Sequence, residues 1–523
     1  MFKEREELLT AITDPEKIWD IIVVGGGATG LGTALDAASR GYKTLLLEQA
    51  DFAKGTSSRS TKLVHGGVRY LAQGDIGLVR EALYERGLLL KNAAHLVKNE
   101  SFIIPNYEWW DGAFYTIGLT FYDLLAGKLS FGRSKHISKK ETINRLPGIQ
   151  QKKLYGGVVY HDGQFDDSRL AINLAQTCLE RGATVLNYFR VTDLLKEDKK
   201  INGVIVKDIE SGISYNIKGK AVINATGVFV DDLLQRDEPH KKLLVKSSQG
   251  IHIVVDRSFM PGDDALMIPK TDDGRVLFAV PWHGKLLIGT TDTPVDEHSL
   301  EPRALEKEIE FVLRTAGKYL TKMPEREDVL SIFAGLRPLA APQDGSAKTK
   351  EISRSHKLIV SASGLITITG GKWTTYRRMA QDTIDKAIET AKLKVSACIT
   401  TDLSIHGNKK DVDRNDHLYV YGSDRDALLG LVKENSEWAE KLHPKMEYIK
   451  AEVIWAVRYE MARKVEDVLA RRVRALFLDA RAAIDMAPIV AELIAVELSR
   501  DKDWENAQVA SFKNLAKGYL INS

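Results

Sequence analysis

Several residues suited to chemistry lie together near the N-terminus, in the stretch "STKLVHGGVRYLAQGD" (residues 60–75). Histidine can move protons near neutral pH, and arginine binds phosphate and carboxylate groups. The stretch is a poor helix and a poor strand, which raises the question of what these residues bind. The members of this candidate site are His65, Gly66, Gly67, Arg69 and Tyr70.

The preceding segment, "WDIIVVGGGATGLGTALDAASRGYKTLLLEQ", predicts a strand–helix–strand unit. Residues 21–24 form a short β-branched run, typical of a buried parallel strand. A helical pattern continues through Ser39, Gly41 ends it, and a second strand closes on Glu48. Between the first strand and the helix lies a G-x-G-x-x-G motif, formed by Gly25, Gly27 and Gly30.

This motif, in this position, predicts a dinucleotide site. Gly25 makes the tight turn, Gly27 lets the backbone approach a pyrophosphate, and Gly30 lets the helix pack on the strand. The helix N-terminus offers free N–H groups and partial positive charge to phosphates. Glu48 can accept hydrogen bonds from a ribose hydroxyl, which disfavours NADP. The unit does not decide between NAD and FAD.

Two distant segments favour FAD. In "KGKAVINATGVFVDDLL" a strand over residues 221–224 leads into Ala225 and Gly227, where small residues would let the chain pass close to a cofactor. In "SGLITITGGKWTTYRRM" a strand, the Gly370–Gly371 turn and a helix follow one another. The N-terminus of that helix could direct N–H dipoles at the flavin edge where negative charge accumulates on reduction.

Together with residues 20–75, these segments form a recognisable set. The chain resembles the FAD-dependent, respiratory glycerol-3-phosphate dehydrogenases, within the D-amino-acid-oxidase-like flavoproteins, over roughly residues 15–495. The glycine motif is shared by many flavoproteins, whereas "HGGVRYL", "GLRPL" and "GGKWTTYR" are far more specific. Further matching segments are "FDDSRL", "FAVPW", "LLIGTTDT" and "YEMARKVEDVLARRVRALFLDARAA".

The resemblance implies that the opening stretch runs beside the flavin ring of a non-covalently bound FAD. Gly66 and Gly67 would let the backbone approach the ring, and Arg69 and Tyr70 would point into the substrate pocket. Besides the glycines of the motif and Glu48, the implied cofactor-binding positions are Thr56, Ser57, Ser60, His65, Gly66, Gly67, Ala225, Gly227, Gly371 and Lys372.

The implied substrate is sn-glycerol 3-phosphate, whose phosphate needs cationic donors. The family's arginine–lysine set corresponds here to Arg69, Arg337, Arg354 and Lys372. Arg337 has apolar neighbours, which predict a partly buried charge that needs a partner. Lys372 opens a helix, an unfavourable place for a cation, which suggests that it faces an anion. Arg69 could instead form a structural salt bridge, and Arg354 could be a solvated charge.

Oxidation at C2, by hydride transfer to FAD, gives dihydroxyacetone phosphate and releases the hydroxyl proton, so a base is needed. His252, in "SQGIHIVV", corresponds to a pocket histidine of the family, and His65 is the second candidate. A core histidine is the alternative for His252. Proton loss to water, helped by Arg337, also stays open.

Residues 107–140 carry aromatic side chains followed by basic ones, as in an interfacial helix on anionic lipid. The alternative is a buried amphipathic helix. The family passes electrons to a membrane quinone, which favours the lipid reading. We therefore expect peripheral attachment to the inner face of the cell membrane. The residues concerned are Trp109, Trp110, Phe114, Tyr115, Phe121, Tyr122, Lys128, Arg133, Lys135, Lys139 and Lys140.

The composition excludes some function classes. With 74 basic and 71 acidic side chains among 523 residues, the chain does not resemble a dedicated nucleic-acid binder. Cys178 and Cys398 lie far apart, so they cannot alone form a zinc site, and no metal is expected. The charged N-terminus lacks the apolar core of a signal peptide, and no apolar run reaches 18 residues. These features predict a cytoplasmic protein. The oligomeric state stays open, with a homodimer as one possibility.

We expect an α/β fold with a Rossmann-like FAD-binding domain, a substrate domain on an antiparallel sheet, and a C-terminal all-α domain. The FAD-binding domain would be discontinuous, over residues 15–75, 155–240 and 355–390. Residues 76–154 and 241–354 would form the substrate domain, and residues 400–523 the helical one. In the last, "RKVEDVLARRVR" could mimic a nucleic-acid helix, but interleaved acids favour a salt-bridged cap.

Three alternatives to a quinone-linked dehydrogenase stay open. An oxidase would use O2 as acceptor and release H2O2. An amino-acid or other hydroxy-acid oxidase of the same fold would need one carboxylate-binding arginine rather than several cations. A flavin-dependent tRNA-modifying or non-catalytic FAD-binding protein would predict an RNA footprint or an empty anion pocket.

Overall fold

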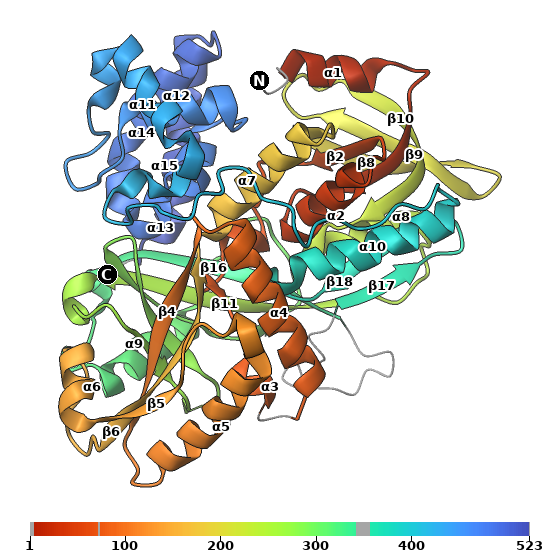
Figure 1. The fold of residues 1–523 in the computed structure, drawn as a ribbon. Coiled ribbons are helices and arrows are strands. Elements are labelled where there is room, and N and C mark those ends of the chain that lie inside the picture. Colours follow the sequence, from red (N-terminus) through yellow and green to blue (C-terminus); the bar gives the residue numbers. More distant parts are fainter. Residues whose placement is uncertain (1–4, 72–73, 273, 341–355, 522–523) are drawn as a thin grey trace.

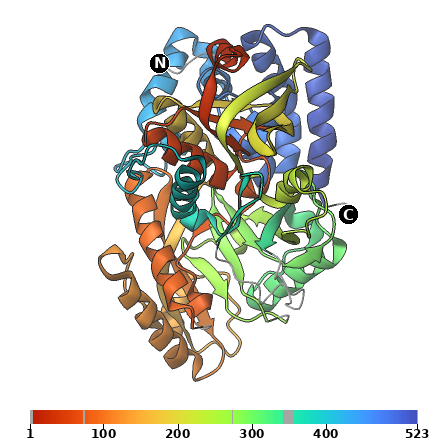
Figure 2. The same ribbon diagram turned by 90° about the vertical axis from the view of Figure 1, so that its right-hand side faces the viewer.

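The computed structural model describes residues 5–71, 74–272, 274–340 and 356–521, and two sheets organise them (Figures 1 and 2). No helix in these ranges is both long enough and apolar enough to cross a membrane. Within the same ranges, the mixed α/β architecture and the C-terminal helices confirm the predicted fold class.

The first sheet is built around a parallel core in the order β18-β10-β1-β2-β7, with β17 antiparallel at one edge. Residues 21–24 of β1 and 45–47 of β2 are apolar and buried, as in parallel sheets covered by helices on both faces. Its strands are β1 (Ile18–Val24), β2 (Thr44–Glu48), β7 (Thr184–Asn187), β8 (Phe189–Glu197), β9 (Lys200–Asp208), β10 (Ser214–Asn224), β17 (His356–Val360) and β18 (Ile366–Gly370).

Helices α2 and α10 pack on each other against this sheet, and α7 packs on α2. Helix α2 ends where Arg40 and Gly41 turn the chain, as the glycine predicted. The helices outside the C-terminal region are α1 (Arg5–Thr13), α2 (Ala28–Ser39), α3 (Val68–Leu71), α4 (Ile76–Asn92), α5 (Asp111–Ala126), α6 (Lys139–Arg145), α7 (Asp167–Glu180), α8 (Val230–Asp237), α9 (Glu306–Tyr319) and α10 (Tyr376–Ala391).

The second sheet is almost entirely antiparallel; among its described pairs β12 and β4 are parallel. It is the antiparallel sheet expected for the substrate domain, and His252 lies on its strand β11. Its strands are β3 (Leu63–Val64), β4 (Val97–Asn106), β5 (Lys135–Ser138), β6 (Gly156–Phe165), β11 (Val245–Asp256), β12 (Ala265–Ile268), β13 (Leu277–Trp282), β14 (Lys285–Gly289), β15 (Thr293–Val295) and β16 (Val329–Ala340).

Two strands belong to a different sheet from the one that the proposed domain boundaries imply. Strands β3 and β6 fall in ranges assigned from the sequence to the cofactor domain, yet both pair within the second sheet. Strand β6 pairs with β4 over ten residue pairs, from Val97–Phe165 to Asn106–Gly156. The chain therefore crosses between the sheets after β6, at Asp166, which caps the N-terminus of α7.

The C-terminal helices form a separate bundle, drawn in blue in Figure 1. Its core also takes in side chains of the second sheet, Trp282 and Phe333. The bundle comprises α11 (Arg425–Glu434), α12 (Lys450–Tyr459), α13 (Ala475–Leu478), α14 (Ala480–Glu497) and α15 (Lys502–Ala516), with a short π-helix over Asp467–Arg472.

The basic segment of this bundle is buried. Arg471, Arg472 and Arg474 are each about 1–2 % exposed. Arg471 and Arg472 both bind the carboxylate of Asp51, which follows β2. The segment is salt-bridged, as the sequence predicted, but it lies between the bundle and the first sheet, so it offers no surface for nucleic acid.

Candidate active site

The carboxyl ends of four strands in the first sheet meet at one edge. Because β1, β2, β10 and β18 run parallel, the residues that follow them converge there. The chain thus brings together Gly25 after β1, Glu48 at the end of β2, Ala225 after β10, and Gly371 after β18. Ligands of open parallel sheets bind at such an edge.

At Gly25 and Gly30 the structure has the steric constraints that the motif predicted. Gly25 has φ +109°, and a Cβ there would lie 2.6 Å from the carbonyl oxygen of Ala225. At Gly30 a Cβ would run into the carbonyl oxygen of Gly25, so only glycine allows α2 to pack this closely on β1. A Cβ at Gly27 would touch Oγ of Ser57 at 3.0 Å.

Ser57 and Glu48 order the loops around the N-terminus of α2. The backbone N–H of Ala28 donates to Oγ of Ser57 over 2.9 Å. The carboxylate of Glu48 accepts from the N–H groups of Gly26 at 2.6 Å and Ala50 at 2.9 Å. Burial raises the pKa of Glu48. Each carboxylate oxygen keeps a second lone pair, so Glu48 can still accept from a ribose hydroxyl.

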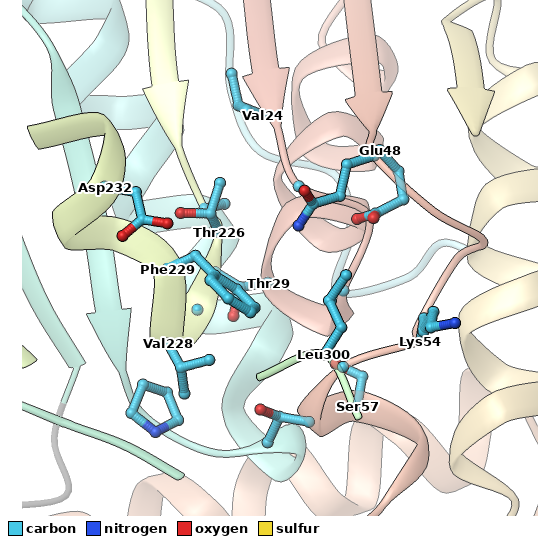
Figure 3. A pocket seen from close by; sticks show the side chains of 18 of the residues that line it. Val24, Thr29, Glu48, Lys54, Ser57, Thr226, Val228, Phe229, Asp232 and Leu300 are labelled. Atoms are coloured by element: carbon cyan, nitrogen blue, oxygen red, sulfur yellow. The ribbon is translucent and has the colours of Figure 1, made fainter. Parts of the chain in front are cut away.

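A cavity of about 800 Å³ lies at this edge (Figure 3). Its size falls within the roughly 300–1,000 Å³ typical of cofactor and ligand sites. Glu48, Lys54 and Ser57 line it on one side, and Val228 and Phe229 on another. Gly25, Gly27 and Ala28, at the N-terminus of α2, line the cavity together with the acid at the end of β2, and this set suits a dinucleotide.

A second cavity, of about 730 Å³, adjoins the first. Both are lined by Thr56, Pro338, Gly371, Lys372 and Trp373, so these residues form the wall between them. Lys372 precedes the short helix Trp373–Thr375, as the sequence predicted. The second cavity is lined by His252 of β11 and Arg337 of β16, and by aromatic residues on β4, β6 and β13.

Arg337 lines this cavity, on β16 opposite Ser248 of β11. Its guanidinium donates to Oγ1 of Thr290 over 3.1 Å and lies 3.6 Å from the carboxylate of Asp292. Gly250 leaves room for the guanidinium, because a Cβ there would collide with it. The side chain is 25 % exposed, which agrees with the partly buried charge predicted from its apolar neighbours.

His252 lies on β11 and is 2 % exposed, in the wall of the same cavity. Its ring stacks on Phe333, with centroids 5.1 Å apart. Burial, followed by the charges of Lys62 and Arg337, lowers the pKa of His252 well below its usual value. The imidazole is therefore neutral.

The opening stretch contains short elements that its composition concealed, β3 before His65 and α3 after Gly67. Gly66 has no space for a Cβ, because the side chains of Leu83 in α4 and Tyr122 in α5 lie against it. His65 and Gly67, with φ +81°, line the second cavity. The close approach that requires glycine at Gly66 is to α4 and α5; its contact with a flavin ring stays a prediction.

Three sequence-derived candidates cannot be placed as side chains. Arg69 and Tyr70 belong to α3, but their side chains lie outside the described part of the structure. Arg354 lies outside the described residues altogether. Ser60, by contrast, is held by Asp167, whose carboxylate accepts from its backbone N–H at 3.2 Å and its hydroxyl at 2.7 Å.

Sequence reasoning missed the buried support beneath this segment. Lys62 is fully buried and donates to Asp167 and to the carbonyl of Ser58, each at 2.7 Å. Arg474 donates to the same Asp167 from the C-terminal bundle at 3.2 Å. The "FDDSRL" motif was the available signal, because its second aspartate is Asp167.

Comparison with known proteins identifies the family. A family model described as FAD dependent oxidoreductase matches residues 20–377. The chain belongs to the FAD-dependent oxidoreductases. FAD is accordingly its cofactor, and the first cavity offers the residues to hold it. A second model, described as the C-terminal domain of alpha-glycerophosphate oxidase, matches residues 362–505 and covers most of the helical bundle.

Curated relatives match the chain over nearly its full length. The mitochondrial glycerol-3-phosphate dehydrogenase of Homo sapiens is 39 % identical, over 99 % of this chain and 76 % of that protein. The mitochondrial glycerol-3-phosphate dehydrogenase SDP6 of Arabidopsis thaliana is 38 % identical, over 98 % of this chain and 88 % of that protein.

Solved structures agree with this placement. A glycerol-3-phosphate dehydrogenase from Bacillus halodurans, complexed with FAD, superposes with a TM-score of 0.81 at 29 % identity, covering 100 % of this chain and 99 % of that one. An L-alpha-glycerophosphate oxidase from Mycoplasma pneumoniae, with FAD bound, shares the fold at 16 % identity and a TM-score of 0.58, over 73 % of this chain and 97 % of that one.

Proposed function

We propose that this chain is a FAD-dependent glycerol-3-phosphate dehydrogenase that oxidises sn-glycerol 3-phosphate to dihydroxyacetone phosphate. The observation that carries the proposal is that two cations, Arg337 and Lys372, line the second cavity, and that Lys372 also lines the FAD cavity. A planar guanidinium suits a phosphate ester. The names of the curated relatives support the same substrate.

Each residue has a distinct role in the proposed reaction. Arg337, oriented by Thr290 and Asp292, binds the phosphate together with Lys372. Bound FAD supplies the two-electron oxidation chemistry. His252, neutral and buried in the cavity wall, takes up the proton of the C2 hydroxyl. Arg69 and Arg354 remain candidates for the same anion pocket.

The test is flavin bleaching without oxygen. Anaerobic addition of sn-glycerol 3-phosphate to the purified holoenzyme should bleach the flavin absorbance, whereas glycerol should not. Arg337→Ala should slow bleaching at low substrate about 10- to 100-fold, because a charge-assisted hydrogen bond is worth about 1.5–3 kcal/mol. Arg181→Ala removes an exposed arginine beyond the end of α7 and should leave bleaching unchanged.

We further propose that a membrane quinone reoxidises the flavin at the inner face of the cell membrane. The support is the outward face of α5 and the preceding turn, where Trp109 is 78 %, Phe114 68 %, Ile117 73 % and Leu124 72 % exposed. Exposed basic residues at and near its end, Arg133, Lys135, Lys139 and Lys140, would suit anionic lipid. The lower left of Figure 2 shows α5 at an extremity of the molecule.

Helix α5 also has an inward face. The helix is therefore partly buried, as in one alternative drawn from the sequence, and partly exposed, as the lipid-binding alternative requires. Leu119 and Tyr122 are buried, and Leu119 joins the apolar cluster of Phe102 and Tyr160 that lines the second cavity. Tyr122 is therefore not a lipid contact, because its hydroxyl donates to Asp162 inside the protein. Tyr115 is half-buried against the same cluster.

The acceptor is tested separately from the substrate. After anaerobic bleaching, a soluble quinone analogue should restore the oxidised spectrum at least about 100-fold faster than air-saturated buffer. Stoichiometric H2O2 and fast reoxidation by air would instead identify an oxidase, the second candidate, which the fold shared with the Mycoplasma oxidase keeps open.

A further inference from the structure

Thr61 and His252 form a hydrogen-bonded pair in the wall of the second cavity. Oγ1 of Thr61 lies 2.9 Å from Nε2 of His252. Thr61 comes from the segment between Ser58 and β3, and His252 from the middle of β11. The two residues are 191 positions apart, so only the tertiary structure joins them.

Access to the two partners differs. His252 is buried, Phe333 stacks on its ring, and Gly289 packs against its edge so closely that a Cβ there would collide with it. Its Nδ1 atom is buried and has no hydrogen-bond partner among the described residues. Thr61 is only half-buried and lines the cavity that also holds Arg337. A small polyol in that cavity therefore meets the threonine hydroxyl before the imidazole.

The hydroxyl of Thr61 is held in place from below. Both of its neighbours are fixed by Asp167: Ser60 through its N–H and hydroxyl, and Lys62 through its ammonium group at 2.7 Å. Lys62 has φ +63°, and its side chain is completely buried beneath the rings of Trp282, Phe333 and Phe477. The backbone at Thr61 is thereby anchored on both sides.

We propose that Thr61 is a catalytic residue that passes the substrate's hydroxyl proton to His252. The inference rests on the proposed function and adds to it the path of the proton. A hydroxyl can accept one hydrogen bond while donating another, so Thr61 can contact the substrate and the imidazole together.

The step balances as a double transfer. The C2 hydroxyl gives its proton to Oγ1 of Thr61, and Thr61 gives its own proton to Nε2 of His252. The C2–H bond gives its hydrogen and electron pair to the FAD oxidant that the proposed function names, and the C2–O single bond becomes a carbonyl. Thr61 ends neutral, and His252 ends as imidazolium.

The charges around the cavity determine whether proton transfer to His252 is favourable. Burial and the charges of Lys62 and Arg337 keep His252 neutral before substrate binds, so Nε2 is available as an acceptor. The same charges oppose the imidazolium. A phosphate ester bound at Arg337 would bring negative charge into the cavity and offset this opposition.

The pairing makes a prediction that needs no turnover. If Thr61 donates to Nε2, the neutral ring must carry its proton on Nδ1. Histidine-selective ¹⁵N labelling of the holoenzyme, with the His252 signals assigned by their loss in His252→Gln, should show the Nδ1–H tautomer. Thr61→Ser should keep the wild-type Nε2 shift, and Thr61→Val should move it. The Nε2–H tautomer in the wild-type protein would overturn the proposal.

Kinetics complete the test with a matched pair of variants. Thr61→Val keeps the shape and removes the hydroxyl, whereas Thr61→Ser keeps the hydroxyl. In anaerobic bleaching, Thr61→Val should lose about 10²–10⁴-fold of the limiting rate, the usual contribution of positioned acid–base groups. Its substrate concentration at half-saturation and its bound FAD should be unchanged, and Thr61→Ser should stay within about tenfold of wild type.

The outcomes separate the two ideas. Bleaching of the wild type at a rate matched by Thr61→Val would overturn the relay and leave the proposed function intact. Absence of bleaching in the wild type would overturn the proposed function and the relay with it. Loss of rate in Thr61→Val, rescue in Thr61→Ser and the Nδ1–H tautomer would support both.

Discussion

Arg169 of α7 and Glu460, the residue after α12, form a doubly hydrogen-bonded ion pair, with N–O distances of 2.8 and 2.7 Å. Both side chains are at most 1 % exposed. The guanidinium of Arg169 also lies over the ring of Tyr421, 4.4 Å from its centroid. The pair therefore joins the helical bundle to the helix that packs on the cofactor-binding sheet.

Breaking this pair should destabilise the protein strongly. Glu460→Ala leaves the Arg169 charge buried without its partner, which costs about 3–5 kcal/mol of unfolding free energy. Urea unfolding followed by tryptophan fluorescence measures the change. Glu389→Ala, which removes an exposed i,i+3 pair with Lys386, is the control and should not shift the midpoint. Equal midpoints for the two variants would contradict a structural role for the Arg169–Glu460 pair.

Gly30→Ala should abolish FAD retention. The added Cβ would collide with the carbonyl oxygen of Gly25 and force α2 away from β1. Overpacking against backbone costs about 1–3 kcal/mol or more, and here it distorts the cofactor site itself. Flavin absorbance per protein after gel filtration gives the answer.

Gly430→Ala is the matched glycine control for this experiment. Gly430 lies in α11, and nothing lies within 4 Å of a Cβ built there. Alanine should leave flavin content unchanged and raise stability slightly, by about 0.5–1 kcal/mol, because glycine is costly inside helices. Full flavin content in Gly30→Ala would show that α2 tolerates displacement.

His406 should make the stability of the protein depend on pH above neutrality. Burial alone would lower the pKa of His406, but hydrogen bonds to Asp424 and Glu180, at 2.6 and 2.7 Å, raise it to about 9. Because the folded-state pKa exceeds the unfolded value of about 6.5, the stabilisation is complete below pH 6.5 and disappears as pH rises through 9.

The His406 effect is measured by comparison with His406→Gln, which cannot carry charge. The wild-type melting temperature should exceed that of the variant at pH 6, and the difference should shrink steadily between pH 6.5 and 9.5. A difference that is independent of pH would mean that the imidazolium contributes nothing to folding.

Charging the exposed face of α5 should weaken membrane binding. In Ile117→Glu/Leu124→Glu, two side chains that are 73 % and 72 % exposed become anionic. Sedimentation with anionic phospholipid vesicles should fall at least about tenfold, since apolar burial and attraction to anionic lipid are both lost. Bleaching by substrate in detergent should be unaffected.

Val395→Glu provides the control for the membrane experiment. Val395 is 83 % exposed and lies just beyond α10, in a different part of the chain from α5. Its variant should sediment like the wild type. Equal binding by the α5 double variant would remove α5 as the lipid contact.

Local sequence determined the cofactor edge of the protein. Gly25 needs a positive φ, and Gly30 has no space for a side chain. Both requirements arise within one turn of six residues, so the local sequence pattern can report them. Glu48 was predictable as the acidic residue of the site because it ends the strand that follows the helix. An antiparallel sheet was expected for the substrate domain, and His252 lies on one of its strands, β11. The strand that carries Arg337, β16, was not predicted from the sequence.

The tertiary structure alone decided which charges are buried and what they face. The sequence indicated salt bridges between the basic segment of Arg471 and Arg474 and the acids interleaved with it. The fold adds distant partners: Arg471 also binds Asp51, while Lys62 and Arg474 bind Asp167, each more than 100 residues away. The need for glycine at Gly66 was visible, but not that α4 and α5 impose it. Desolvation depends on everything packed around a group, so no local pattern reports it. For the same reason the pairing of Thr61 with His252, from two different segments, emerged only from the fold.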